Sequence, residues 1–231
     1  MDFALTDDQQ TIRSAVAELA GKFDDHYWMT KDHNHEFPQE FYDAFADGGW
    51  LGITTPEEYG GSVYGISEAC LLLEEVAAAG AGMNGASSIH MSIFGMHPVI
   101  LHGSEELKAR TLPRIVNGDL HVCFGVTEPG AGLDTTRITT FAKRDGDRYI
   151  VNGQKVWTSR AEQSDLMVLL ARTTPKDQVA KKADGLSVFL VDMREAKKNG
   201  MTSMKKISDI WPYDIVRPIG RPVISTMRLV I

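Results

Sequence analysis

Two short segments of the chain carry residue types that could bind a ligand. The first is CFGVTEPGAGLDTT, residues 123–136, in which Thr, Glu, Pro and two Gly follow an apolar run. This composition predicts either a sharp turn or a loop whose backbone comes close to a flat or charged ligand. The residue types alone leave both interpretations open.

The second segment is NGQKVWTS, residues 152–159. In a strand that starts at Gln154, alternation places Lys155, Trp157 and Ser159 on one face. A tryptophan two residues from a hydroxyl could stack on a flat ring and hydrogen-bond to the edge of that ring. The alternative is a half-buried Trp157 that covers the end of a barrel, and spacing alone favours this alternative.

Other familiar catalytic patterns do not occur in the sequence. It contains no GxSxG, HExxH or Walker A segment, and TEPGAG is not a GxGxxG loop. His33 and His35 could bind a metal, but a solvated polar loop is the favoured interpretation of KDHNHE, so we predict no metal site. Cys70 and Cys123 lie in apolar stretches without a CxxC partner, which argues against a disulfide or a zinc site, and Cys70 is predicted to be a small core residue.

The bulk composition narrows the partners and the compartment. A net charge of −7 argues against general binding to nucleic acid or to an anionic membrane surface. No apolar stretch provides the roughly 20 uninterrupted residues that cross a bilayer, and the initial MDFALTDDQQ lacks a signal-peptide core. We therefore expect a cytoplasmic protein with no nucleic-acid partner and no membrane partner.

The elements that would position the two segments differ between the halves of the chain. The first half is predicted to be helical, because Thr6 and Gln9 form a capping box and Ser104 precedes two glutamates at another helix start. SIHMSIFGMHPVILHG is apolar nearly all round, which predicts a buried helix that bends or ends near Pro98.

From about His121 the pattern changes to strands. HVCFGV, DLMVLLAR and LSVFLVDM are apolar and rich in strand formers. Asn152-Gly153 between RYIV and QKVW predicts a hairpin, and Asp145-Gly146 predicts another turn. The terminal MRLVI resembles a strand with nothing after it, which would leave an exposed edge.

These patterns together predict an α+β fold. An N-terminal all-helical domain covers residues 1–120, and an antiparallel β-barrel-like domain covers residues 121–231 and becomes divergent after about residue 200.

The ordered set of motifs resembles the acyl-CoA dehydrogenase family. PEEYGG at residues 56–61, the run HGSEELKARTLPRIVNGDLHVCFGVTEPGAG and then NGQKVWTS occur in the family's order. The resemblance covers roughly residues 1–200. It implies a helical domain, a β domain and FAD, with the isoalloxazine ring between the β domain and a C-terminal helical domain.

The resemblance also implies roles for single residues of the first segment. Phe124, Val126 and Thr127 would meet the pyrimidine side of the flavin ring, and Thr127 would give backbone and hydroxyl contacts to the ring edge. Gly132 would let the chain pass close to the cofactor or the acyl thioester.

In the second segment, Trp157 would lie against the ring and Ser159 would hydrogen-bond near N5, where family members often carry threonine. A donor at N5 stabilises the hydride acceptor as charge develops there.

Two departures from the family pattern bear on substrate and activity. Leu133, the predicted substrate-binding position, stands where a serine commonly helps to hold the substrate, and its side chain cannot hydrogen-bond. The family continues for about 150 further residues as a helical bundle that carries the general base, usually a glutamate, whereas this chain stops at Ile231. We therefore expect a truncated chain and assign no catalytic residue, and Glu128 belongs to the loop.

The implied function is FAD-dependent α,β-dehydrogenation of an acyl-CoA thioester. Electrons would pass to an electron-transfer flavoprotein, and the full-length parent would be a homo-oligomer. The alternatives are a flavin-dependent oxidase or monooxygenase of the same fold, which Leu133 supports slightly, a non-catalytic flavin-binding or assembly module, and a fragment without function.

Overall fold

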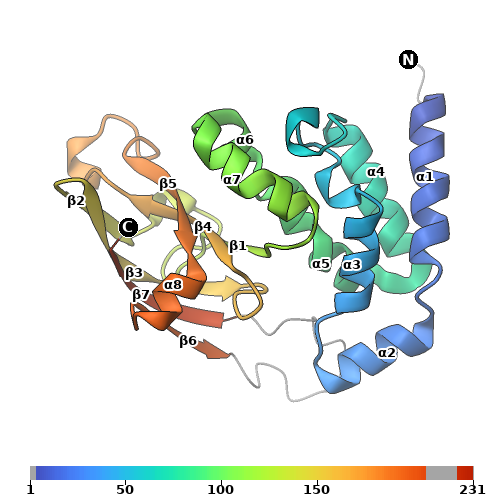
Figure 1. Cartoon of the computed structure of the whole chain (residues 1–231). Helices are drawn as coiled ribbons and strands as arrows, with labels where there is room; N and C mark the ends of the chain where they lie inside the picture. The colour runs from blue at the N-terminus through green and yellow to red at the C-terminus, as the bar shows by residue number, and fades with distance from the viewer. Residues whose placement is uncertain (1–3, 207–222, 231) are drawn as a thin grey trace. The chain divides into compact units, whose positions relative to one another are not determined.

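The computed structural model of the chain describes residues 4–206 and 223–230. Two compact units divide between Leu120 and His121. Figure 1 shows helices throughout the first unit and a sheet in the second.

The first unit consists of short helices. Its elements are α1 (Asp7–Ala20), α2 (Asp25–Asn34), α3 (Gln39–Asp47), η1 (Trp50–Gly52), η2 (Glu57–Tyr59), α4 (Ile66–Val76), the π-helical turn η3 (Ala77–Ala81), α5 (Gly82–Phe94), α6 (His97–His102) and α7 (Glu105–Val116).

Local sequence signals account for several of these helix ends. The predicted capping box forms at the start of α1, where Thr6 accepts from the backbone of Gln9 and the Gln9 side chain accepts from Thr6. Ser104 caps α7, as predicted, by accepting from the amide of Leu107. Pro98 lies in the first turn of α6, so the predicted break in the apolar helix is confirmed.

Aromatic side chains fill the core of the helical unit. Phe41 and Phe45 are fully buried, with ring centroids 4.5 Å apart, and Trp28 meets Phe41 edge-on at 5.0 Å. Cys70 does not join this core and is exposed, because the buried positions of α4 fall on its other face. The prediction that Cys70 is a core residue is therefore wrong, whereas Cys123 in the second unit is buried.

The second unit is built on one sheet. Its elements are β1 (Val122–Gly125), η4 (Thr135–Arg137), β2 (Phe141–Asp145), β3 (Arg148–Thr158), β4 (Leu166–Arg172), η5 (Lys176–Gln178), β5 (Leu186–Asp192), α8 (Met193–Lys198), β6 (Thr202–Lys206) and β7 (Val223–Val230).

The strands follow the order β1-β4-β2-β3-β7-β6, and β5 pairs with β4. The pairs β1/β4 and β2/β4 are parallel, and the other pairs are antiparallel. No pairing among the described residues joins β1 to β6, so the sheet is mixed and open rather than an antiparallel barrel. The long connection between β1 and β4 explains the difference, because a crossover of that length lets two strands run parallel.

The hairpin lies at a different place from the one that Asn152-Gly153 predicted. The two-residue turn is Gly146-Asp147, between the paired residues Asp145 and Arg148, and Gly146 has φ 65°. Strand β3 continues through Asn152-Gly153, so the hairpin predicted there is wrong. A Cβ at Gly153 would lie 2.2 Å from the hydroxyl oxygen of Thr140, so glycine is needed here for close packing rather than for a turn.

The terminal strand is paired on both sides. Figure 1 shows β3, β7 and β6 side by side, and β7 pairs antiparallel with both neighbours. The prediction that MRLVI leaves an exposed edge is therefore wrong. The proline-rich stretch before it, residues 207–222, lies outside the described residues.

Candidate functional site

The TEPGAG segment forms a tight turn directly after β1. The amide of Glu128 donates to the carbonyl of Ala131 at 2.9 Å, and the amide of Ala131 donates back at 3.1 Å. Gly132 and Leu133 follow on the surface. A Cβ at Gly132 would meet no atom within 4 Å, and Gly132 has no positive φ. The fold of the described chain therefore does not require glycine here, whereas a ligand that approaches the backbone would.

Two hydrogen bonds join this loop to β3. The amide of Val156 donates to the carbonyl of Thr127 at 2.9 Å, and the Lys155 ammonium donates to the carbonyl of Val126 at the same distance. The structure thereby brings together the residues of the two segments that the sequence analysis singled out. Thr127 and Trp157 lie on adjoining pieces of chain.

A bulge in β3 controls the direction of the tryptophan. The register with β7 shifts between Lys155 and Thr158, and Trp157 has φ 61°. Left-handed backbone is a genuine outlier for a bulky residue and costs about 1–3 kcal/mol. Despite that cost, the Trp157 side chain is 51% exposed. Strain of this kind, kept for an exposed aromatic ring, points to a role in binding.

The bulge also breaks the alternation predicted for this strand. Trp157 and Ser159 are exposed, as a shared face requires, but Lys155 is fully buried and its neighbour Val156 is buried as well. The prediction that Lys155 shares a face with Trp157 is therefore wrong. An extra residue in a strand reverses the inward and outward order on one side of it.

The remaining predicted positions lie on the same unit. Phe124 is 39% exposed between the buried Cys123 and Gly125 of β1, and Leu133 is fully exposed. Val126 and Thr127 are half-buried. Contacts tie Val126 and Thr127 to the start of the bulge, and Phe124, Gly132 and Leu133 belong to the same stretch of chain.

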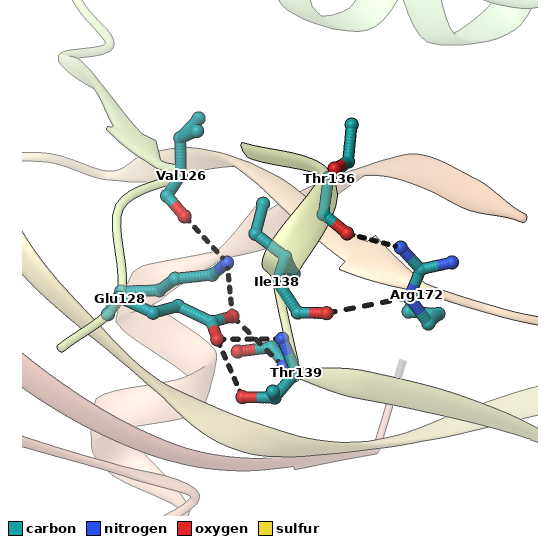
Figure 2. A network of polar contacts seen from close by, with 8 residues as sticks. Val126, Glu128, Thr136, Ile138, Thr139 and Arg172 are labelled. Atoms are coloured by element: carbon teal, nitrogen blue, oxygen red, sulfur yellow. Dashed lines mark hydrogen bonds and ion pairs between the residues drawn. The ribbon is translucent and has the colours of Figure 1, made fainter. Parts of the chain in front are cut away.

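Behind the loop lies a buried ion pair that the sequence analysis did not identify. Lys155 and Glu128 are joined at 2.9 Å, and their side chains are 0% and 3% exposed. Figure 2 shows the Glu128 carboxylate next to Thr139, whose amide and hydroxyl each donate to it at 2.7 Å. The amide of Thr140 donates at 2.9 Å.

These contacts determine the charge of the pair. Burial alone would raise the pKa of Glu128, but the hydrogen bonds from Thr140, Thr139 and Lys155 outweigh it and lower the pKa to about 2. Burial lowers the pKa of Lys155, and the Glu128 carboxylate opposes that shift. Glu128 is thus a carboxylate with its acceptor sites occupied, and it is unsuited to take a proton from a substrate.

A second buried cation continues this polar region. Figure 2 shows the Arg172 guanidinium facing the carbonyls of Thr136 and Ile138, at 3.0 and 3.4 Å. The guanidinium also donates to the carbonyl of Lys182 at 3.1 Å and to the carbonyls of Thr174 and Asp184 at 3.4 Å. Arg172 fixes the chain that precedes Thr139. The signal in the sequence was a basic residue at the end of the apolar run DLMVLLAR.

The described residues offer neither a cluster of metal ligands nor a membrane-spanning helix. No group of three or more His, Cys, Asp or Glu side chains in residues 4–206 and 223–230 could hold a metal ion. No helix in that part of the chain is long and apolar enough to cross a membrane.

The arrangement fits a planar ligand. It offers an exposed tryptophan on a strained bulge, an adjoining loop with open space at Gly132, and an exposed hydroxyl at Ser159. Aromatic faces stack on flat rings, and hydroxyl and amide groups bind the polar edges of such rings.

Comparisons with known proteins agree with the resemblance noted in the sequence. Residues 6–119 match the family model described as "Acyl-CoA dehydrogenase, N-terminal domain", and residues 123–217 match "Acyl-CoA dehydrogenase, middle domain".

Individual relatives carry corresponding names. The chain is 42% identical over 144 residues to "Acyl-CoA dehydrogenase FadE26" of Mycobacterium tuberculosis, which covers 62% of this chain and 35% of that protein. It is 34% identical over 214 residues to "Probable acyl-CoA dehydrogenase YngJ" of Bacillus subtilis, which covers 93% of this chain and 53% of that protein. The chain thus spans about half or less of the length of these relatives.

A solved structure is similar over the whole chain. The structure of a glutaryl-coenzyme A dehydrogenase–glutaryl-CoA complex superposes with a TM-score of 0.83 at 25% identity, over 100% of this chain and 56% of that one. With both family domains matched in order along it, the chain belongs to the acyl-CoA dehydrogenase family.

Proposed function

We propose that this chain forms the flavin-binding wall of an FAD-dependent acyl-CoA dehydrogenase that introduces an α,β-double bond into an acyl-CoA thioester. One observation supports this most directly. The β3 bulge keeps Trp157 exposed in a left-handed conformation next to the TEPGAG turn, in a chain of this family.

The residues of the wall take separate roles in this proposal. Trp157 stacks against the isoalloxazine ring, and Phe124 and Val126 face its pyrimidine side. The carbonyl of Thr127 already accepts from Val156, so its amide and hydroxyl are the groups that bind the ring edge. Gly132 lets the backbone approach the cofactor or the thioester, and Leu133 contacts the substrate through apolar surface alone.

FAD supplies the hydride acceptor when it is bound. Ser159 donates a hydrogen bond near N5 and stabilises negative charge that develops there. The proton on the α-carbon must pass to a base, and we assign that role to no described residue. Glu128 is excluded because its carboxylate is committed to Lys155, Thr139 and Thr140.

The partners of the proposed function follow from the reaction. An acyl-CoA thioester is the substrate, and an electron-transfer flavoprotein takes the electrons from the reduced cofactor. We also propose that the full-length parent acts as a homo-oligomer, as the family resemblance implies.

Flavin retention tests the first half of the proposal. The purified chain is incubated with FAD and desalted, and its visible absorbance is recorded. We expect the chain to retain a flavin band, and we expect Trp157→Ala to lower the affinity of the chain for FAD at least tenfold. Val188→Ala is the matched control, since Val188 is an exposed apolar residue of β5 in the same unit. A chain that keeps no flavin would contradict the proposed site.

Reduction by substrate tests the second half. Saturated acyl-CoA thioesters of several lengths are added without oxygen to the flavin-loaded chain, alone and mixed with a C-terminal helical domain of the family. Because no described residue is assigned as the base, bleaching of the flavin band is expected only in the mixture and for a subset of lengths. A flavin-loaded mixture that no thioester bleaches would contradict dehydrogenation as the proposed function. Oxygen consumption after reduction, without an added electron acceptor, would instead favour an oxidase or monooxygenase.

A further inference from the structure

Lys155 of β3 is placed to control the orientation of the peptide planes on both sides of Thr127. Its ammonium donates to the carbonyl of Val126 at 2.9 Å and is fully buried. The Val126–Thr127 peptide is trans, so its carbonyl and the Thr127 amide point in opposite directions. By fixing the carbonyl, Lys155 fixes the direction of the Thr127 amide.

The next peptide plane is fixed by a neighbour of Lys155. The amide of Val156 donates to the carbonyl of Thr127, and the Glu128 amide on the other side of that plane donates to Ala131. Both planes that flank Thr127 are thus held from residues 155–156. The proposed ring-edge donor cannot rotate unless these bonds break.

Glu128 keeps the Lys155 ammonium at this place. Its carboxylate accepts from Lys155, from the Thr140 amide and twice from Thr139 (Figure 2). A buried charge whose partners are complete has one favourable geometry, because each partner would otherwise remain unsatisfied. The pair therefore joins the loop, the chain at residues 139–140 and β3 at a single point.

The Lys155–Glu128 pair also lies next to the strained backbone of Trp157. Trp157, with φ 61°, lies two residues after Lys155, and strained backbone persists only where its surroundings over-determine it. The bonds from Lys155 and Val156 to the loop are the contacts that anchor the strand where the bulge begins.

We propose that Lys155 and Glu128 are positioning residues for the flavin site, which set the direction of the Thr127 amide and hold the Trp157 bulge without contacting the cofactor. The expected effect on flavin binding rests on the proposed function, whereas the orientation of the Thr127 amide can be measured without any cofactor. The competing explanation is a buried ion pair that serves stability alone, and apolar replacement of such pairs is often neutral or stabilising.

The test uses Lys155→Met, with the double variant Lys155→Met/Glu128→Gln as the second variant because it leaves no unpaired buried charge. Arg194→Met is the control, since it removes an ion pair with the buried Asp165 of the same unit, whose carboxylate also accepts from the amide of His121 rather than from the loop. The affinity for FAD is measured by absorbance and fluorescence at a temperature where circular dichroism shows each variant folded. The amide resonances of Thr127 and Glu128 are followed by NMR in the flavin-free chain.

We expect the Thr127 amide resonance to shift or broaden in Lys155→Met and in the double variant, and the affinity for FAD to fall at least about tenfold in both. Arg194→Met should leave the affinity within about twofold. A folded double variant with the wild-type resonance and wild-type affinity would overturn the inference, and it decides the question if Lys155→Met fails to fold. If the wild-type chain binds no FAD, the proposed function fails, and an unchanged Thr127 resonance is then the result that overturns the positioning role.

Discussion

Both units bury an apolar core, but they differ in the polar side chains that they bury with it. Among the described residues, the helical unit buries aromatic and aliphatic side chains, and its buried polar residues are uncharged: Thr55, Ser88, Ser92 and Thr111. All the charged residues that are buried in the described part of the chain belong to the sheet unit: Glu128, Lys155, Arg160, Asp165 and Arg172. Apolar burial is non-directional and tolerates several packings, whereas a buried charge needs its partner at one place. The difference indicates that the helical core supplies stability and the polar core fixes geometry.

The largest expected effect is the loss of stability when a buried ring is removed from the helical core. Phe41→Ala removes a fully buried ring that meets the rings of Phe23, Trp28 and Phe45, so the helical unit should lose about 3–5 kcal/mol of unfolding free energy. Hydrogen exchange followed by mass spectrometry should show the loss of protection in α1 to α5. Phe41→Leu should cost clearly less. Equal losses for the two variants would mean that ring packing contributes little.

The next effect concerns substitutions that preserve volume. Glu128→Leu leaves Lys155 buried without its carboxylate, which should cost the sheet unit about 3 kcal/mol. Leu72→Met is the matched change in the helical core, since Leu72 is fully buried, and it should cost less than about 1.5 kcal/mol. Urea unfolding of both variants measures the contrast. Similar costs would remove the distinction between the two cores.

The two units should also differ in how their stability changes at low pH. The pKa of Glu128 is lowered from 4.5 to about 2, so the folded state favours the carboxylate. The stability that this gives is complete above about pH 4.5 and is lost as the pH falls towards 2, and it amounts to something on the order of 3 kcal/mol. The lowered carboxyl pKa values of Glu40, Glu68 and Glu105 in the helical unit belong to exposed or part-exposed groups, whose effect solvent screens.

Hydrogen exchange between pH 5 and pH 2.5 measures this contrast. Protection in β1 to β3 should fall before protection in the helices, and Glu128→Gln should make the response of the strands to pH shallower. Strands that keep their protection at pH 2.5 while the helices lose theirs would contradict the prediction.

Alanine substitutions at two glycines of the sheet unit should differ in cost, by less than the substitutions above. A Cβ at Gly153 would lie 2.2 Å from the Thr140 hydroxyl oxygen, so Gly153→Ala should cost about 1–3 kcal/mol. Gly130→Ala meets no atom within 4 Å and has no positive φ, so its cost should stay within about 0.5 kcal/mol. Thermal unfolding of the two variants tests this, and a larger loss for Gly130→Ala would contradict the packing argument.

Gly153 also shows where the sequence was insufficient. Asn-Gly is a strong local signal for a hairpin, yet the pairing of β3 with both β2 and β7 carries the strand straight through it. The capping box of α1, the proline break and the strands β1, β4 and β5 were predictable, because each depends on residues close in the chain. The parallel pairing of β1 with β4 depends on a distant partner, and no local pattern encodes it.

Only part of the candidate site could be predicted from the sequence as well. The motifs identified the TEPGAG turn and the residues around Trp157, but alternation placed Lys155 on the wrong face because one bulge reverses the order of the strand. The partners of Glu128 lie 11 to 27 residues away in the sequence, so only the fold shows that they meet.

The smallest expected effect has the opposite sign from the others. Trp157 holds a left-handed conformation that asparagine adopts more readily, so Trp157→Asn should stabilise the sheet unit by up to about 1 kcal/mol. The same substitution removes the exposed ring and should abolish flavin retention. Phe124→Asn is the control, since Phe124 is exposed but has no positive φ, and it should gain no stability. Thermal unfolding and flavin absorbance of the same samples measure both quantities. If Trp157→Asn destabilised the unit, the exposed ring would contribute to packing, and the bulge would not be a strain kept for binding.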